Sequence, residues 1–129
     1  MARILIIEDN AANMKLAIMV LQNAGHTALC AVDAEIGMAF ARTGRPDLIL
    51  MDIQLPGMDG LAATVLLKKD PATAAIPVIA LTAMATKGDH EKATAAGCDA
   101  YVVKPFRHED LYAAIDALLL KSGPEPATA

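Results

Sequence analysis

Five short apolar runs recur along the chain, and they are almost continuous rather than alternating with polar residues. They occupy residues 3–7, 27–32, 47–51, 77–81 and 100–103. A strand that is buried on both faces has this pattern, because helices cover both sides of a parallel sheet. The runs therefore predict five parallel strands at the centre of the fold.

The segments between these runs carry apolar residues at helical spacing. In the first segment the periodic positions are Asn13, Ala17, Val20, Leu21 and Ala24, and in the last they are Leu111, Ala114, Ile115, Leu118 and Leu119. Gly25 is placed to end the first helix, and Ser122-Gly123-Pro124 to end the last. The alternation predicts an α/β fold: a doubly wound (βα)5 sheet with right-handed crossovers and helices on both faces.

Four of the predicted strands end on side chains suited to handling a phosphoryl group. These are Glu8 with Asp9, Asp52, Thr82, and Lys104 followed by Pro105. Ligands bind at the carboxyl edge of open α/β sheets, and although periodicity does not give the strand order, the flavodoxin-like order 2-1-3-4-5 would bring the three acids together there. Three carboxylates with one ammonium group suggest a divalent cation and a further negatively charged group.

Each of these residues also has a purely structural interpretation. Asp9-Asn10 is suited to capping the first helix, and taken alone that role would suffice. Asp52 could likewise cap, although Asp59 is better placed for it. Thr82 could be an ordinary strand-end hydroxyl, and Lys104 a surface charge. The structural interpretation is weaker for these residues taken together. It would require four unrelated strand ends to carry, by accident, side chains that suit a phosphoryl group and a metal ion.

Composition and charge narrow the classes of function. The chain has 129 residues, enough for one domain, and is 55% hydrophobic but only 3% aromatic, so aliphatic side chains must build its interior. A net charge of −4 without a Lys/Arg cluster argues against nucleic-acid binding. No run is long enough to span a membrane, and the first residues do not resemble a signal peptide.

Cysteine, serine and histidine usage excludes several chemistries. Cys30 and Cys98 lack a metal-ligand pattern and are expected to be buried or neutral free thiols in a reducing, cytoplasmic environment. Ser122 is the only serine, which argues against a serine hydrolase, and the glycine motifs of dinucleotide and P-loop sites are missing. The three histidines show no ligand spacing and are expected to be solvated or capping; they are His26, His90 and His108.

Taken together, the strand-end motifs resemble one known family. The matching segments are Ile4-Leu5-Ile6-Ile7-Glu8-Asp9-Asn10, Asp47-Leu48-Ile49-Leu50-Met51-Asp52, Leu55-Pro56-Gly57-Met58-Asp59-Gly60, Thr82-Ala83 and Val103-Lys104-Pro105. Over residues 3–121 the chain resembles response regulator receiver domains of two-component signalling. Within that family, segments 13–16, 51–56 and 97–101 look like the stand-alone, single-domain DivK-type cell-cycle regulators. Receivers attached to hybrid histidine kinases share much of this pattern.

The resemblance implies a mechanism that passes through an aspartyl phosphate. The residues that handle the phosphoryl group would be Asp52 as phosphoacceptor, Thr82 and Lys104. The metal ligands would be Glu8, Asp9, Asp52 and the backbone carbonyl of Gln54, holding Mg2+, for which Mn2+ would substitute. Pro105 would hold the Lys104 turn through a cis peptide bond, and Gln54 and Met84 would influence how water reaches the phosphate.

A conformational switch is implied by the same resemblance. Thr82 would bind a phosphoryl oxygen and Tyr101 would turn inward, which changes the surface formed by the fourth helix, the fifth strand and the fifth helix. This output surface would include Lys87, His90, Tyr101, Val103, Phe106 and Tyr112. Phosphorylation would favour a conformer that is already present, so the unphosphorylated protein would keep partial activity.

The implied partners are a histidine kinase or a histidine phosphotransfer protein, and a downstream protein at the output surface. The phosphodonor would dock over the first helix, at Ala11, Ala12, Met14, Lys15 and Ile18. The chain would be a signalling phosphoacceptor rather than an enzyme, a monomer or weak dimer, with a receiver domain at residues 1–121 and a flexible tail at 122–129.

Two alternatives stay open. The chain could be a receiver excised from a hybrid histidine kinase, which has the same site chemistry. With less support, it could be a phosphatase with an aspartate nucleophile. Such enzymes usually need a second acid close to the nucleophile and a substrate-capping insertion, whereas Ile53-Gln54 follows Asp52 and no insertion is evident.

Overall fold

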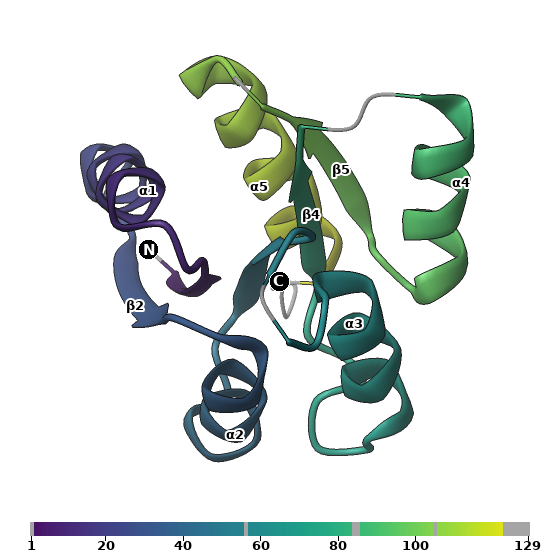
Figure 1. Cartoon of the computed structure of the whole chain (residues 1–129). Coiled ribbons are helices and arrows are strands. Elements are labelled where there is room, and N and C mark those ends of the chain that lie inside the picture. The colour runs from purple at the N-terminus through teal and green to yellow at the C-terminus, as the bar shows by residue number, and fades with distance from the viewer. Residues whose placement is uncertain (1, 56, 84–85, 105, 123–129) are drawn as a thin grey trace.

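The computed structural model describes residues 2–55, 57–83, 86–104 and 106–122, and within them strands and helices alternate five times. The strands are β1 (Arg3–Ile7), β2 (Thr27–Ala31), β3 (Leu48–Asp52), β4 (Val78–Thr82) and β5 (Ala100–Val103). The helices are α1 (Ala11–Asn23), α2 (Ala34–Gly44), α3 (Gly60–Lys69), α4 (Lys87–Ala96) and α5 (His108–Ser122). Figure 1 shows the helices arranged around a central sheet.

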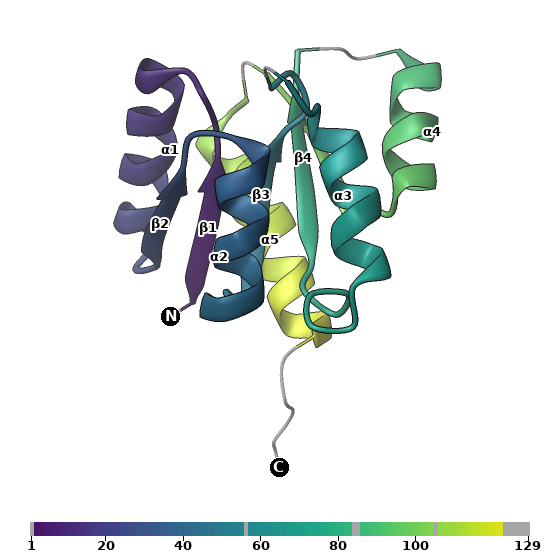
Figure 2. The same cartoon turned by 60° about the horizontal axis from the view of Figure 1, so that its bottom comes forward.

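The sheet is parallel throughout, with the order β2-β1-β3-β4-β5. This confirms the predicted doubly wound α/β fold, including the adjacency of the first and third strands. The register pairs Ile7 with Met51, Asp52 with Leu81, and Thr82 with Val103. The ends of β1, β3, β4 and β5 therefore lie level with one another, at the edge of the sheet opposite the N-terminus (Figure 2).

Two hydrophobic cores lie on opposite faces of the sheet. Ile4 and Ile6 of β1 pack with α1 and α5 on one face, whereas Leu5 and Ile7 pack with α2 and α3 on the other. Successive side chains of a strand point to opposite faces, so a continuous apolar run supplies both cores. Helix α4 contacts α3 and the edge strand β5 (Figure 1).

The predicted element boundaries need small corrections. Strand β2 ends at Ala31, because Val32 lies outside the sheet and is exposed. Strands β3 and β4 begin and end one residue later than predicted, so Asp52 and Thr82 are their last residues. Helix α5 includes Ser122, one residue beyond the predicted domain boundary, and the rest of the predicted tail, residues 123–129, lies outside the described residues.

The buried stripe of α1 also differs from the prediction. Met14, Ala17, Val20 and Leu21 are buried, whereas Asn13 is exposed and the chain has left the helix at Ala24. Met14 belongs to the core cluster that α1 shares with α5, so it offers little exposed surface to the predicted docking partner. The other predicted docking residues, Ala11, Ala12, Lys15 and Ile18, are exposed or half-buried.

Both cysteines are free thiols, as predicted, but their surroundings differ. Cys30 is exposed and Cys98 is half-buried, and desolvation also raises the pKa of the Cys30 thiol. Burial raises the pKa of the Cys98 thiol, so it is neutral at physiological pH. Among the described residues, no helix is both long and apolar enough to cross a membrane.

Candidate functional site

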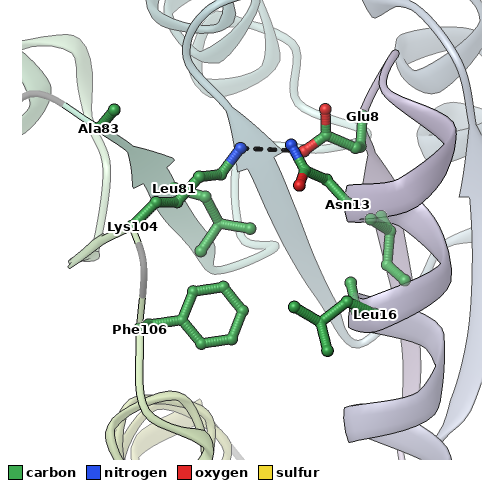
Figure 3. Close-up of a pocket in the computed structure, with 9 residues that line it drawn as sticks. Glu8, Asn13, Leu16, Leu81, Ala83, Lys104 and Phe106 are labelled. Atoms are coloured by element: carbon green, nitrogen blue, oxygen red, sulfur yellow. Dashed lines mark hydrogen bonds and ion pairs between the residues drawn. The ribbon is translucent and has the colours of Figure 1, made fainter.

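The carboxyl ends of β1, β3 and β5 bring Glu8, Asp52 and Lys104 into contact. The Lys104 ammonium donates to Glu8 Oε1 at 3.0 Å (Figure 3) and lies 3.6 Å from Asp52 Oδ1. The Glu8 and Asp52 side chains are only 3% and 5% exposed, so both carboxylates are largely removed from water. At low exposure an ion pair is screened little, and Lys104 is therefore a strong local source of positive charge.

Backbone amides at the ends of these strands orient the two buried carboxylates. The Asn10 N–H donates to Glu8 Oε2 at 3.1 Å, and the Gln54 N–H donates to Asp52 Oδ1 at 3.1 Å. In both cases the donor lies two residues after the acid, in the turn that leaves the strand. The backbone of the turn after each strand thus orients the carboxylate at the end of that strand.

Asp9 and Asp52 do not cap the helices that follow them. Asn10 caps α1, its Oδ1 accepting the Asn13 N–H at 2.9 Å. Asp59 caps α3, its Oδ1 accepting the Ala62 N–H at 2.8 Å, as the sequence indicated. The capping interpretation therefore applies to neighbouring residues and does not account for Asp9 or Asp52.

Glu8, Asp9 and Asp52 form a compact acidic cluster. One carboxylate oxygen from each lies within 4.8 Å of the others, and Asp9 is exposed while the other two are buried. Burial raises the pKa of Glu8, and a hydrogen bond with Asp52 raises it further against the opposing effects of the Asn10 N–H and Lys104. Three carboxylate oxygens at this spacing, one side open to water, could hold a metal ion.

Glycine at position 60 allows α3 to start directly against the end of β3. The Gly60 N–H donates to the Ile53 carbonyl at 2.9 Å. A Cβ at this position would overlap the carbonyl oxygen of Asp52, so any larger residue would push the strand end away. Gly60 therefore helps to position Asp52, a role that was not predicted from the sequence.

Thr82 and Lys104 are joined through the backbone. The Lys104 N–H donates to the Thr82 carbonyl at 2.7 Å, which extends the β4–β5 pairing by one bond. Thr82 is buried at 1% exposure, next to exposed Ala83. Gln54 is exposed in the turn after β3, whereas Met84 and Pro105, with its predicted cis peptide bond, lie outside the described residues.

Tyr101 lies on β5, where it pairs with Ala80 of β4. It is half-buried, and its ring makes an edge contact with the ring of His90 on α4, at 4.9 Å between centroids and 61° between planes. Lys87 and Val103 are exposed, and Tyr112 is half-buried, with its hydroxyl donating to the Val20 carbonyl at 3.1 Å.

Phe106 differs from the other residues predicted for the output surface, because it lines a cavity of about 350 Å³ beside the Lys104–Glu8 pair. Leu16 on α1 faces it across this cavity, and Leu81 also lines the cavity (Figure 3). Leu16 was not among the site residues predicted from the sequence. Leu16 is exposed beside the buried Ala17. Single exposed leucines are common on protein surfaces, so nothing in the sequence singled out this one.

The model of the response regulator receiver domain family matches residues 4–116. The chain belongs to the receiver domain family. This receiver is 46% identical over 103 residues to the polar-differentiation response regulator DivK of Brucella anthropi, covering 80% of this chain and 84% of that protein. The DivK protein of Brucella ovis is 45% identical over the same coverage.

Solved receiver structures have the same fold. The signal receiver domain of a signal transduction histidine kinase from Syntrophus aciditrophicus superposes with a TM-score of 0.89 at 28% identity, covering 100% of this chain and 98% of that one. The receiver domain of a sensor histidine kinase from Pseudomonas aeruginosa is 34% identical, with a TM-score of 0.83 and coverage of 95% and 98%. That neighbour has a magnesium ion coordinated in its active-site cleft.

Proposed function

We propose that this receiver is a phosphorelay switch that accepts a phosphoryl group on Asp52 from a phosphohistidine. The donor would be a cytoplasmic histidine kinase or histidine phosphotransfer protein. The observation that carries the proposal is the buried Asp52 carboxylate, oriented by the Gln54 N–H and flanked by Lys104 and two further acids at the open edge of the sheet. Membership of the receiver family supports the same chemistry.

The acidic cluster fits Mg2+. Glu8, Asp9 and Asp52 offer only oxygen ligands, the exposed Asp9 leaves room for water, and the Gln54 carbonyl would add a fourth protein ligand. Mg2+ prefers such a site because it retains several waters and binds through few carboxylates. When bound, the cation neutralises oxygen charge on the transferring group. The magnesium ion of the Pseudomonas neighbour supports this assignment.

In the proposed transfer, an Asp52 oxygen forms a bond to phosphorus as the phosphorus–nitrogen bond to the donor imidazole breaks. The electron pair of the broken bond stays on the imidazole, which leaves as the neutral ring if its other nitrogen carries a proton and otherwise takes a proton from water. Lys104 would neutralise charge on the phosphoryl oxygens, and the Gln54 N–H would keep the attacking oxygen oriented. Positioning and charge neutralisation supply most of the catalysis in phosphoryl transfer, so one lysine and fixed carboxylates suffice.

The product would carry roughly two negative charges and three acceptor oxygens where one carboxylate stood. The Thr82 hydroxyl is proposed to donate to one of these oxygens, and Tyr101 to rotate inward as the chain after β4 moves. The signal is then a shift in the population of two conformers, read by a downstream protein at the surface of α4, β5 and α5. The protein would act through this surface rather than as an enzyme, as a monomer or weak dimer.

Intact mass spectrometry tests the acceptor chemistry directly. After incubation with acetyl phosphate, we expect a single phosphoryl adduct that requires Mg2+ and is lost in hydroxylamine, as an acyl phosphate must be. A phosphorylated histidine phosphotransfer protein serves as the second donor. Absence of the adduct with both donors would overturn the proposal, and continuous release of phosphate from small phosphoesters would favour the phosphatase instead.

Mg2+ is expected to stabilise the fold, and to do so increasingly as pH rises. Because the pKa of Glu8 is raised in the folded state, the folded protein holds a proton that the unfolded chain releases. Without Mg2+, the free energy of unfolding therefore falls as pH rises from the ordinary glutamate pKa through the raised value. Loss of the Glu8 proton also makes this carboxylate available to bind Mg2+. The stabilisation by Mg2+ therefore grows over the same pH interval. Urea unfolding with and without Mg2+ measures both effects.

Glu8→Gln is the matched variant, because it keeps the size of the side chain and removes the charge. It should lose most of this pH dependence and most of the stabilisation by Mg2+. If Mg2+ raised the free energy of unfolding of Glu8→Gln as much as that of the wild type, the cation would have to bind elsewhere.

A further inference from the structure

Helix α4 is held against the rest of the domain by few buried side chains. Its sequence is mostly small or polar, and Ala93 is the one buried residue among the described residues Lys87–Ala96. It lies beside β5 and α3 at the edge of the molecule (Figure 1). A single large side-chain contact can therefore account for much of the coupling between this helix and the sheet.

The ring contact between His90 and Tyr101 is such a contact. The two centroids lie 4.9 Å apart in an edge-type geometry, with His90 exposed on α4 and Tyr101 half-buried on β5. This distance and geometry are typical of favourable aromatic pairs. If the Tyr101 ring rotates inward, as proposed above, it must move away from the His90 ring and lose this contact.

We infer that His90 is a positioning residue that holds Tyr101 in its outward conformer and thereby sets how readily the switch turns on. The inference rests on the proposed function, since it assigns the regulation of the same switch. Rotation of Tyr101 must break the contact, so its strength is part of the free-energy difference between the two conformers. Edge-type aromatic pairs correspond to a factor of about two to ten in such an equilibrium.

This role of His90 predicts the direction in which its removal shifts the equilibrium between the two Tyr101 conformers, which ordinary surface packing does not. Loss of the His90 ring should favour the inward conformer, both before and after phosphorylation, because the phosphoryl group and the ring contact act on the same equilibrium. A residue that only covers the surface would change the stability of the fold and leave the switch equilibrium unchanged.

Tyrosine fluorescence can follow the switch, because the chain has two tyrosines and no tryptophan. In a Tyr112→Phe background Tyr101 is the only strong emitter, and its quenching by acrylamide reports its exposure. The full chain is titrated with beryllofluoride in Mg2+, which mimics the phosphoryl group on Asp52. The variants are His90→Ala, His90→Phe, which restores an aromatic ring, and His108→Ala as the control.

His108 is a suitable control because its ring lies near Tyr112 instead, at 6.4 Å between centroids. We expect His90→Ala to lower the beryllofluoride concentration at half-conversion by about two- to tenfold. It should also reduce quenching of the unliganded protein, whereas His90→Phe and His108→Ala should resemble the background. Equal midpoints for His90→Ala and the background would overturn the inference, even if thermal stability changed.

Intact mass after incubation with acetyl phosphate, measured on the same samples, separates the two possible failures. A normal adduct with unchanged Tyr101 quenching would overturn the role of His90 and leave the phosphoacceptor intact. Absence of the adduct from every sample would overturn the proposed function itself, and with it this inference.

Discussion

Asp52→Asn is expected to abolish formation of the phosphoryl adduct with every donor. The amide nitrogen and oxygen of asparagine are poor nucleophiles, while its size matches that of aspartate, so the packing of the buried position is kept. Intact mass after incubation with acetyl phosphate and Mg2+ measures the loss. Asp59→Asn is the matched control, because Asn and Asp cap helices about equally well and α3 should be undisturbed.

The same substitution should stabilise the unphosphorylated fold. It removes a buried charge that lies within 4.8 Å of two other carboxylates, at the cost of one 3.6 Å contact with Lys104. The net gain should be about 1 kcal/mol in urea unfolding without Mg2+. An adduct on Asp52→Asn equal to that of the wild type would contradict the assignment and point to Asp9.

Lys68→Met is expected to cause the largest loss of stability, about 2 kcal/mol, because charge-assisted hydrogen bonds are lost without a replacement. The Lys68 ammonium donates to the Ile76 carbonyl at 2.8 Å and to Asp99 Oδ2 at 2.9 Å. Asp99 Oδ2 also accepts the Val78 N–H at 2.8 Å. One lysine of α3 thus ties the segment before β4 to the residue before β5.

Urea unfolding at constant m-value measures this loss, and Lys69→Met is the control. Lys69 is the exposed neighbour in the same helix turn, so its substitution should change the free energy of unfolding by no more than about 0.5 kcal/mol. The Lys68 contacts lie at the amino ends of the strands, opposite Asp52, so the adduct should form normally on folded Lys68→Met. Equal losses for both variants would show that the network contributes little.

The sequence was informative where a local pattern determines the structure. Continuous apolar runs predicted the parallel strands, and polar residues at their ends predicted which side chains meet, because the carboxyl ends of parallel strands share one edge. The strand order came from analogy with flavodoxin-like folds, since β1 and β3 become neighbours through a crossover that periodicity does not encode.

What the sequence did not predict depends on contacts between distant segments. Met14 is placed in the core by its packing against α5, and Phe106 is placed on the cavity beside Leu16. The Lys68–Asp99 pair and the His90–Tyr101 ring contact likewise join different elements. Helix and strand propensities act over a few residues, so they identify the elements but not these pairings.

The Lys104–Glu8 ion pair joins residues 96 positions apart in the chain. During synthesis the three acids emerge well before the lysine, so a nascent chain carries the repelling cluster without its internal cation. Under the proposed mechanism such a chain is a poor phosphoacceptor until the fifth strand has joined the sheet. On that mechanism, competence to receive the phosphoryl group would be acquired only when β5 has joined the sheet, and incompletely folded copies of the protein would not take part in phosphotransfer.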